Sequence, residues 1–195
     1  KEKEVIIKRF SLNNEPRQTL EKIGQQFSVT RERIRQIEKI ALGKLRRTIE
    51  NTKLSEVTRI ARELLTARGG LSVEQELVSG IVSRLYSTSE IDMHIVKLAL
   101  AICPEFIYGE KNGLFHPYWR LKHIDEQELA MVSDVVYHLL AKKKDVVSVT
   151  DIATEAEKHF EEKGRKVSKE TIASLLSIDV RFKRVKEGVG LMGWR

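Results

Sequence analysis

The residues best able to do chemistry lie in one short stretch, VTRERIRQIE at residues 29–38. Arg31, Glu32, Arg35 and Gln36 occupy positions i, i+1, i+4 and i+5, which a helix places on one side. Arg can bind guanine, Glu can accept from cytosine N4 and Gln can pair with adenine, so this face suits the DNA major groove. The competing interpretation is an ordinary solvated helix face, but Glu32 and Gln36, one turn apart, form no ion pair.

The remaining residues show no pattern typical of an enzyme active site. The five histidines show no metal-ligand spacing, no glycine-rich phosphate loop is present, and no serine or cysteine sits in a recognisable nucleophile setting. The single cysteine, Cys103, permits neither an internal disulfide nor a cysteine-based zinc site, and it fits a reducing cytoplasm. We therefore expect a cytoplasmic, non-enzymatic protein that uses no cofactor or metal.

The distribution of charge along the chain favours a polyanionic partner. The 195 residues carry a formal net charge of +7. Residues 1–53 hold 14 Lys and Arg against 7 Asp and Glu, whereas residues 54–195 hold 21 of each sign. The whole positive excess therefore lies in the first quarter of the chain, as in a nucleic-acid-binding segment. No apolar run approaches the ~20 residues of a membrane span, so we expect no membrane partner.

Two helices are expected to position the charged face. Thr19 is a plausible cap for a helix over residues 20–27, and Ser28 or Thr30 for the helix that follows. A turn of about three residues between them makes the helices cross sharply, which predicts a helix-turn-helix. The N-terminal turn of its second helix is the part that meets base edges. The apolar positions expected to face inward are Leu20, Ile23, Phe27, Ile34, Ile37, Ala41 and Leu45.

The segment TLEKIGQQFSVTRERIRQIEKIALGKLRR, residues 19–47, closely resembles region 4 of the primary sigma factors of bacterial RNA polymerase. VIIKRFSL, residues 5–12, is similar to the helix that precedes the motif in that family, so the resemblance covers residues 1–47. It implies recognition of a promoter −35-type element and contact with the flap of the polymerase β subunit. Three positions depart from the family pattern, because Ile40 and Gly43 replace basic residues and Lys22 replaces an acidic one.

The resemblance also assigns expected roles to side chains. Arg31, Glu32 and Gln36 are expected to face bases in double-stranded promoter DNA. The residues expected to contact phosphates or the groove rim are Arg33, Arg35, Thr19 and Lys39.

The remaining three quarters of the chain read as two copies of one domain. Pairs of similar residues recur at offsets of 75 to 77 residues over the whole length, which is hard to obtain by chance. Each copy is expected to have three helices. The first lies near 54–67 and 126–142, the second follows a small-residue cap, with Ser72 and Gln75 forming a capping-box pattern, and the third lies near 90–102 and 169–177. The recurring positions include Leu64-Leu65 with Leu139-Leu140, Phe106 with Phe182, and Trp119 with Trp194.

Each copy is expected to close with a short β-hairpin, which makes a winged helix. In FIYGEKNGLF, residues 106–115, Asn112-Gly113 suits a type I′ turn. The second hairpin is expected in FKRVKEGVGLMGW, residues 182–194. The second copy is loosely similar to the winged-helix domain of RNA polymerase delta-type subunits.

DNA binding by the two repeats is less expected than protein binding. Glu90 and Asp92 open the third helix of the first copy, where carboxylates repel phosphate, so that copy is expected to contact protein or to act as a spacer. The second copy offers a possible second DNA surface, formed by Lys169, Lys183, Arg184 and Lys186.

The sequence therefore predicts a mainly α protein with three modules. These are a helix-turn-helix domain (1–53), a first winged-helix-like repeat (54–123) and a second (124–195). The predicted function is sequence-specific promoter recognition with RNA polymerase core, with a transcription regulator as a possible partner of the repeats. One alternative is a non-enzymatic polymerase-binding module that uses a sigma-like head without reading bases. Another is an ordinary repressor that borrows the motif.

Overall fold

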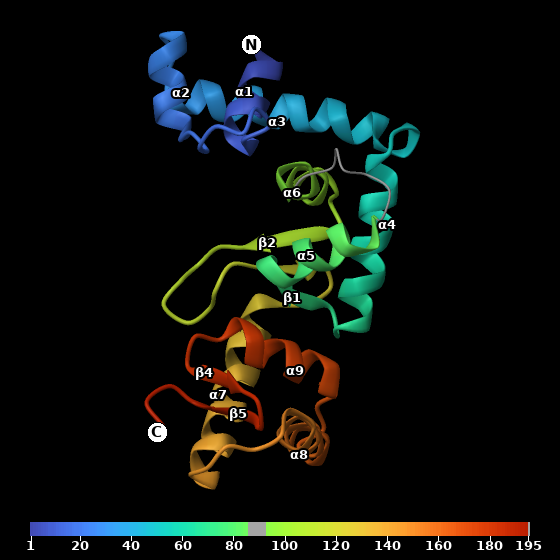
Figure 1. Ribbon diagram of the computed structural model, residues 1–195, viewed down its shortest axis with the longest axis vertical. Helices are drawn as coiled ribbons and strands as arrows, with labels where there is room; N and C mark the ends of the chain where they lie inside the picture. The colour runs from blue at the N-terminus through green and yellow to red at the C-terminus, as the bar shows by residue number, and fades with distance from the viewer. Residues whose placement is uncertain (86–92, 195) are drawn as a thin grey trace. The chain divides into compact units, whose positions relative to one another are not determined.

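The chain is mainly α-helical with short antiparallel hairpins, as predicted, in a computed structural model that describes residues 1–85 and 93–194 (Figure 1). It divides into two compact units. The N-terminal unit comprises Lys1–Ala61 and Val78–Pro104, and the C-terminal unit comprises Arg62–Leu77 and Glu105–Arg195. The described elements are α1 (Glu2–Phe10), α2 (Leu20–Phe27), α3 (Arg31–Thr48), η1 (Ile49–Asn51), α4 (Leu54–Ala67), β1 (Leu71–Val73), α5 (Glu74–Arg84), α6 (Met93–Ile102), β2 (Phe106–Gly109), β3 (Tyr118–Leu121), α7 (Glu126–Lys143), α8 (Val149–Glu162), α9 (Lys169–Ile178), β4 (Phe182–Val185) and β5 (Gly188–Leu191).

Helices α1, α2 and α3 form the predicted helix-turn-helix in the N-terminal unit. Thr19 caps α2 by accepting from the backbone N–H of Lys22 at 3.1 Å, and Thr30 caps α3 by accepting from that of Arg33 at 3.1 Å. Ser28, the other candidate cap for α3, instead ends α2 in the left-handed conformation with φ 55°. The small core enclosed by the three helices contains Val5, Ile23, Ile34 and Ile37, with Leu20, Phe27 and Val29 packed against it.

Gly24 allows the backbone of the turn between α2 and α3 to approach α2 closely. The backbone N–H of Val29 donates to the carbonyl oxygen of Gly24 at 2.9 Å. A Cβ at position 24 would lie 2.7 Å from the carbonyl oxygen of Val29, which is inside van der Waals contact. The crossing of α2 and α3 therefore requires glycine at this position.

A second apolar cluster extends the N-terminal unit beyond the helix-turn-helix. Helix α6 packs against α1 and the C-terminal half of α3, and the side-chain Nε–H of Arg46 donates to the carbonyl oxygen of Ile102 at 2.8 Å. Thus the third helix predicted for the first repeat shares a core with the helix-turn-helix. Glu90 and Asp92 lie outside the described residues. The buried members of this cluster are Ile6, Ala41, Leu98 and Ile102.

The C-terminal unit contains the predicted second repeat in the predicted order. Helices α7 and α9 pack against the β4–β5 hairpin, and α8 packs against both helices; these elements run from orange to red in Figure 1. Each helix begins at a side-chain cap, provided by Asp125, Ser148 and Ser168 respectively. The core includes the fully buried side chains of Leu140 and Phe160.

In each predicted repeat, the segment before the second helix pairs with the second strand of the hairpin. In the first, β1 pairs with β3 in a sheet of order β1-β3-β2, and Leu71 lies opposite Arg120. In the second, the equivalent Val147 forms an isolated bridge with Val189 on β5.

The type I′ turn predicted at Asn112-Gly113 is wrong. β2 pairs with residues 118–121, and an eight-residue loop, 110–117, connects them. The side-chain oxygen of Asn112 accepts from the backbone N–H groups of Leu114 and Phe115 at 2.8 and 2.7 Å, and its backbone N–H donates to the carbonyl oxygen of Phe115 at 3.1 Å. Residues 112–115 therefore form a local turn within the longer loop and not the tip of a two-residue hairpin.

This loop belongs to the core of the C-terminal unit. The Phe115 side chain is 2% exposed, and its backbone forms a bridge with Asp179. The backbone N–H of His116 donates to the carbonyl oxygen of Ile178 at 2.7 Å, and that of Val180 donates to Leu114 at 2.9 Å. The hairpin of the first repeat therefore shares one core with the second, although the boundaries at 53 and 123 remain a prediction.

Candidate nucleic-acid interface

The outer face of α3 presents the polar side chains singled out in the sequence. Arg31, Glu32, Arg35, Gln36 and Lys39 are all exposed. Since the opposite face is anchored by its buried aliphatic residues, these side chains cannot turn inward. The residues on the buried face of α3 are Ile34, Ile37 and Ala41.

Polar side chains on this face bond to one another. The Nε–H and Nη2–H groups of Arg35 donate to the two carboxylate oxygens of Glu32 at 2.9 and 2.7 Å. These hydrogen bonds lower the pKa of the Glu32 carboxyl, against a smaller opposing effect of desolvation. Arg33 donates to the amide oxygen of Gln36 at 3.3 Å. The i, i+3 spacing of Glu32 and Arg35 is the sequence signal for this pair, and considering Glu32 with Gln36 alone missed it.

A partly buried ion pair fixes α1 against α3 behind the outer face. The Nε–H of Arg9 donates to the Glu38 carboxylate at 3.0 Å, and each side chain is 16% exposed. Arg9 also donates through Nη1 to the carbonyl oxygen of Gln18 at 3.1 Å, which ties down the loop before α2. Sequence reasoning missed this contact because its partners are 29 residues apart and carry no local pattern.

Of the residues predicted for the groove rim, Thr19, Arg33 and Arg35 lie near the N-termini of α2 and α3, and Lys39 lies in the middle of α3. Thr19, at the start of α2, is exposed and keeps its hydroxyl hydrogen available as a donor, and Arg33 is exposed on the flank of α3. Two of the three departures from the family pattern, Ile40 and Gly43, lie further along α3. Ile40 is 49% exposed, and a Cβ at Gly43 would meet nothing within 4 Å.

The possible second DNA surface lies in the C-terminal unit, and there α9 is largely covered. Within α9 only its first two residues, Lys169 and Glu170, are exposed. Thr171 donates its hydroxyl to the carbonyl oxygen of Gly69 at 2.7 Å, and Ser174 donates to that of Arg68 at 2.6 Å. The backbones approach so closely that a Cβ at position 69 would lie 2.2 Å from the Thr171 nitrogen.

The basic side chains of this unit are not all free to meet a phosphate. Arg184 lies along α9, where its Nη2 donates to the Ser177 hydroxyl at 2.9 Å and to the Ala173 carbonyl at 3.2 Å. Lys183 on β4 and Lys186 in the hairpin turn are exposed. Their role on a second DNA surface remains a prediction, and the covered α9 makes groove entry by this helix sterically unfavourable.

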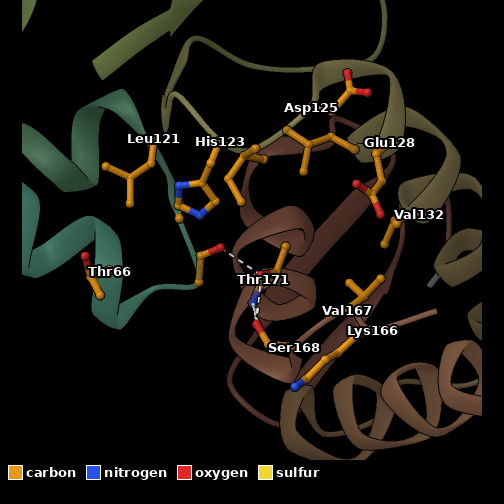
Figure 2. Close-up of a pocket in the computed structure, with 14 residues that line it drawn as sticks. Thr66, Leu121, His123, Asp125, Glu128, Val132, Lys166, Val167, Ser168 and Thr171 are labelled. Atoms are coloured by element: carbon orange, nitrogen blue, oxygen red, sulfur yellow. Dashed lines mark hydrogen bonds between the residues drawn. The ribbon is translucent and has the colours of Figure 1, made fainter. Parts of the chain in front are cut away.

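A cavity of about 390 Å³ lies beside the N-terminus of α9, and some of its polar side chains take part in structural bonds (Figure 2). Asp125 accepts from the backbone N–H of Gln127 at 3.0 Å, and the Ser168 and Thr171 hydroxyls bond each other at 2.8 Å. Over residues 1–85 and 93–194, no group of three or more His, Cys, Asp or Glu side chains could hold a metal ion. No helix in the same residues is long and apolar enough to cross a membrane.

Comparison with known proteins confirms the resemblance of the first quarter of the chain. Residues 1–47 match the family model of sigma-70, region 4. RNA polymerase sigma factor SigA of Nostoc sp. is 51% identical over 59 residues, which is 30% of this chain and 15% of SigA. SigA of Clostridium acetobutylicum is 48% identical over 56 residues (29% and 15%), and RpoD of Neisseria gonorrhoeae is 48% identical over 54 residues (28% and 8%).

This chain covers 15% or less of the length of each of these three relatives. No solved structure matches the chain.

Proposed function

We propose that this protein is a sequence-specific DNA-binding transcription initiation factor that recognises a promoter −35-type element together with RNA polymerase core. The exposed N-terminal turns of α3, within a region 4-like helix-turn-helix, carry the proposal. In it, Arg31, Glu32 and Gln36 contact bases in the major groove. Arg33, Arg35, Lys39 and Thr19 contact phosphates or the groove rim.

Charge supports this assignment. The excess of seven positive charges lies within residues 1–53, so the electrostatic attraction to phosphate is concentrated on the segment that carries the readers. Arg31 and Gln36 are both exposed, whereas Ile34 is buried. An exposed side chain can reach a base edge without any rearrangement of the core.

Selection of duplexes from a randomised pool by the full chain tests the proposal. Arg31→Ala and Gln36→Ala should each cost about 1–3 kcal/mol on the selected duplex and relax specificity at one position. Glu50→Ala, an exposed residue of η1, serves as a control that should leave specificity unchanged. Equal losses on selected and random duplexes would show that neither side chain reads a base.

The polymerase partner is tested separately. The region 4 resemblance supports contact with the β flap, so RNA polymerase core should retain the full chain in a pull-down. Retention without selective DNA binding would favour the alternative, a polymerase-binding module that does not read bases. Selective DNA binding without retention would favour a repressor that uses the motif.

We assign the C-terminal unit to protein contacts, with a polymerase subunit or a transcription regulator as partner. The covered face of α9 supports this assignment, because an ordinary winged helix inserts its third helix into the groove. The equal numbers of acidic and basic residues after position 53 support it as well. Tight, sequence-selective DNA binding that survives Arg31→Ala and Gln36→Ala together would overturn this part of the proposal.

A further inference from the structure

Strand β4 forms one edge of the small sheet in the predicted second repeat. It pairs with β5, and β5 is bonded on its other side to Val147. Val189 uses both of its backbone groups there, donating to Val147 at 2.8 Å and accepting from it at 3.1 Å. Arg184 lies opposite Val189, so this pair exchanges no hydrogen bonds between β4 and β5. The backbone N–H and carbonyl groups of Arg184 therefore point away from β5.

The free edge of β4 presents a row of unpaired backbone groups. Hydrogen-bonding direction alternates along a strand, so the carbonyl oxygen of Phe182 points the same way as the groups of Arg184. Within residues 1–85 and 93–194, none of these three groups has a hydrogen-bond partner. Lys183 and Arg184 are exposed, so solvent reaches this edge. An exposed edge of this kind is a template for one more strand.

Charge decides which kind of strand this edge favours. Residues 182–191 carry three cations, Lys183, Arg184 and Lys186, against one carboxylate, Glu187. A second copy of β4 paired across the edge would bring like charges opposite one another, which is destabilising. A strand with carboxylates at alternate positions would instead form cross-strand ion pairs with the cations. The edge therefore disfavours self-association and favours an acidic partner.

The unpaired backbone groups favour a peptide over DNA, although the cations would attract either. The carbonyl oxygens of Phe182 and Arg184 are acceptors, and only a donor can pair with them. An extended peptide supplies N–H donors at the spacing of a strand, whereas a phosphodiester chain offers acceptor oxygens. The order of donors and acceptors along β4 therefore matches a polypeptide.

We propose that β4 is a docking edge for an extended acidic peptide segment of a partner protein, which adds to the sheet as an antiparallel strand. One peptide residue then pairs with both backbone groups of Arg184, and a second donates to the carbonyl oxygen of Phe182. Main-chain hydrogen bonds provide affinity, and Lys183 and Arg184 select carboxylates. The inference rests on the proposed function, in which the C-terminal unit contacts protein, and it names the surface and the chemistry of the partner.

Substitutions at position 184 separate the role of the backbone from that of the side chain. Arg184→Pro removes the outward N–H, and an edge strand tolerates proline because this N–H takes no part in the ladder. Arg184→Ala removes the same side chain and keeps the N–H, so it is the matched control. The full chain and both variants are titrated by calorimetry with a capped peptide of alternating Val and Glu, and with its Val and Lys counterpart. Amide hydrogen exchange of the parent protein, measured by NMR, reports on the Arg184 N–H directly.

The Val–Glu peptide should bind the parent protein at least about 10-fold more tightly than the Val–Lys peptide. Arg184→Pro should bind the Val–Glu peptide about 5-fold more weakly than Arg184→Ala does, the usual effect of one lost hydrogen bond. The same peptide should slow the exchange of the Arg184 amide in the parent protein.

Absence of binding, or equal affinity for the two peptides, would overturn the inference. An Arg184 amide that exchanges equally fast with and without bound peptide would overturn it as well, whether or not Arg184→Pro folds. Slower exchange of this amide with duplex DNA, and not with peptide, would assign the edge to nucleic acid. Duplex selection through Arg31 and Gln36 is measured separately, so a failure at β4 leaves promoter recognition standing. A chain that selects no duplex but binds the Val–Glu peptide at β4 would refute promoter recognition alone.

Discussion

Phe115 lies in the predicted first repeat, and replacing it by Ala should destabilise the predicted second repeat. The Phe115 ring is 2% exposed inside the core of the C-terminal unit. It packs edge-on against Tyr118, with ring centroids 5.6 Å apart. Truncation to Ala removes these contacts and leaves a cavity beside a backbone bridge to Asp179.

The expected cost is about 3–5 kcal/mol, the usual range for a buried Phe→Ala change. The C-terminal unit has on the order of 100 residues, for which total stability is about 5–15 kcal/mol. The change should therefore lower the melting temperature of this unit by roughly 12–22 °C. Lys111→Ala, an exposed position in the same loop, should shift it by little and serves as the control.

The two tryptophans allow a specific assay. Both Trp119 and Trp194 lie in the C-terminal unit, so tryptophan fluorescence reports its unfolding in urea. In a Trp119→Phe background, the remaining signal comes from Trp194, within the second repeat. Phe115→Ala should move this transition to lower urea. An unchanged Trp194 transition would refute the shared core and show that residues 124–195 unfold as an independent domain.

Three further outcomes follow from single positions. Gly24→Ala should destabilise the N-terminal unit by about 1–3 kcal/mol, because the new Cβ would meet a carbonyl oxygen. Gly43→Ala should stabilise α3 by about 1 kcal/mol, because its Cβ would meet nothing within 4 Å. Thermal unfolding followed by the helical signal at 222 nm distinguishes the two variants. Lys39→Gln should reduce the slope of the logarithm of the DNA-binding constant against the logarithm of salt concentration by about 1, and Lys183→Gln should leave this slope unchanged. A slope that changes with Lys183→Gln and not with Lys39→Gln would place the phosphate contacts in the C-terminal unit. Burial raises the pKa of Tyr118 above the unfolded value of ~10. The stabilisation that this shift contributes is present below pH ~10 and should be lost as pH rises toward the folded-state pKa. Urea midpoints compared from pH 8 to 11 should show this loss in the parent protein but not in Tyr118→Phe.

The sequence by itself determined the helix-turn-helix and the side of α3 that faces outward. The 3.6-residue period of Ile34, Ile37 and Ala41 fixes the buried stripe, and the cap at Thr19 fixes where α2 begins. The sequence left Ser28 or Thr30 as the cap of α3, and the structure decided for Thr30. These features depend on residues close together in the chain, so local patterns are sufficient to predict them. The order of three helices and a hairpin in the second repeat was accessible in the same way.

Only the tertiary structure decided which surfaces of the repeats are buried and which are exposed. No local pattern predicts that Phe115 enters a core formed largely by residues after 125, or that Thr171 donates to the carbonyl of Gly69, 102 residues away. An exposed recognition helix and a covered helix show the same kind of amphipathic pattern. The polar residue types that bond a neighbouring backbone are also those that would bond DNA. Which partner they take depends on the distance between segments remote in the chain, and that distance is set by packing.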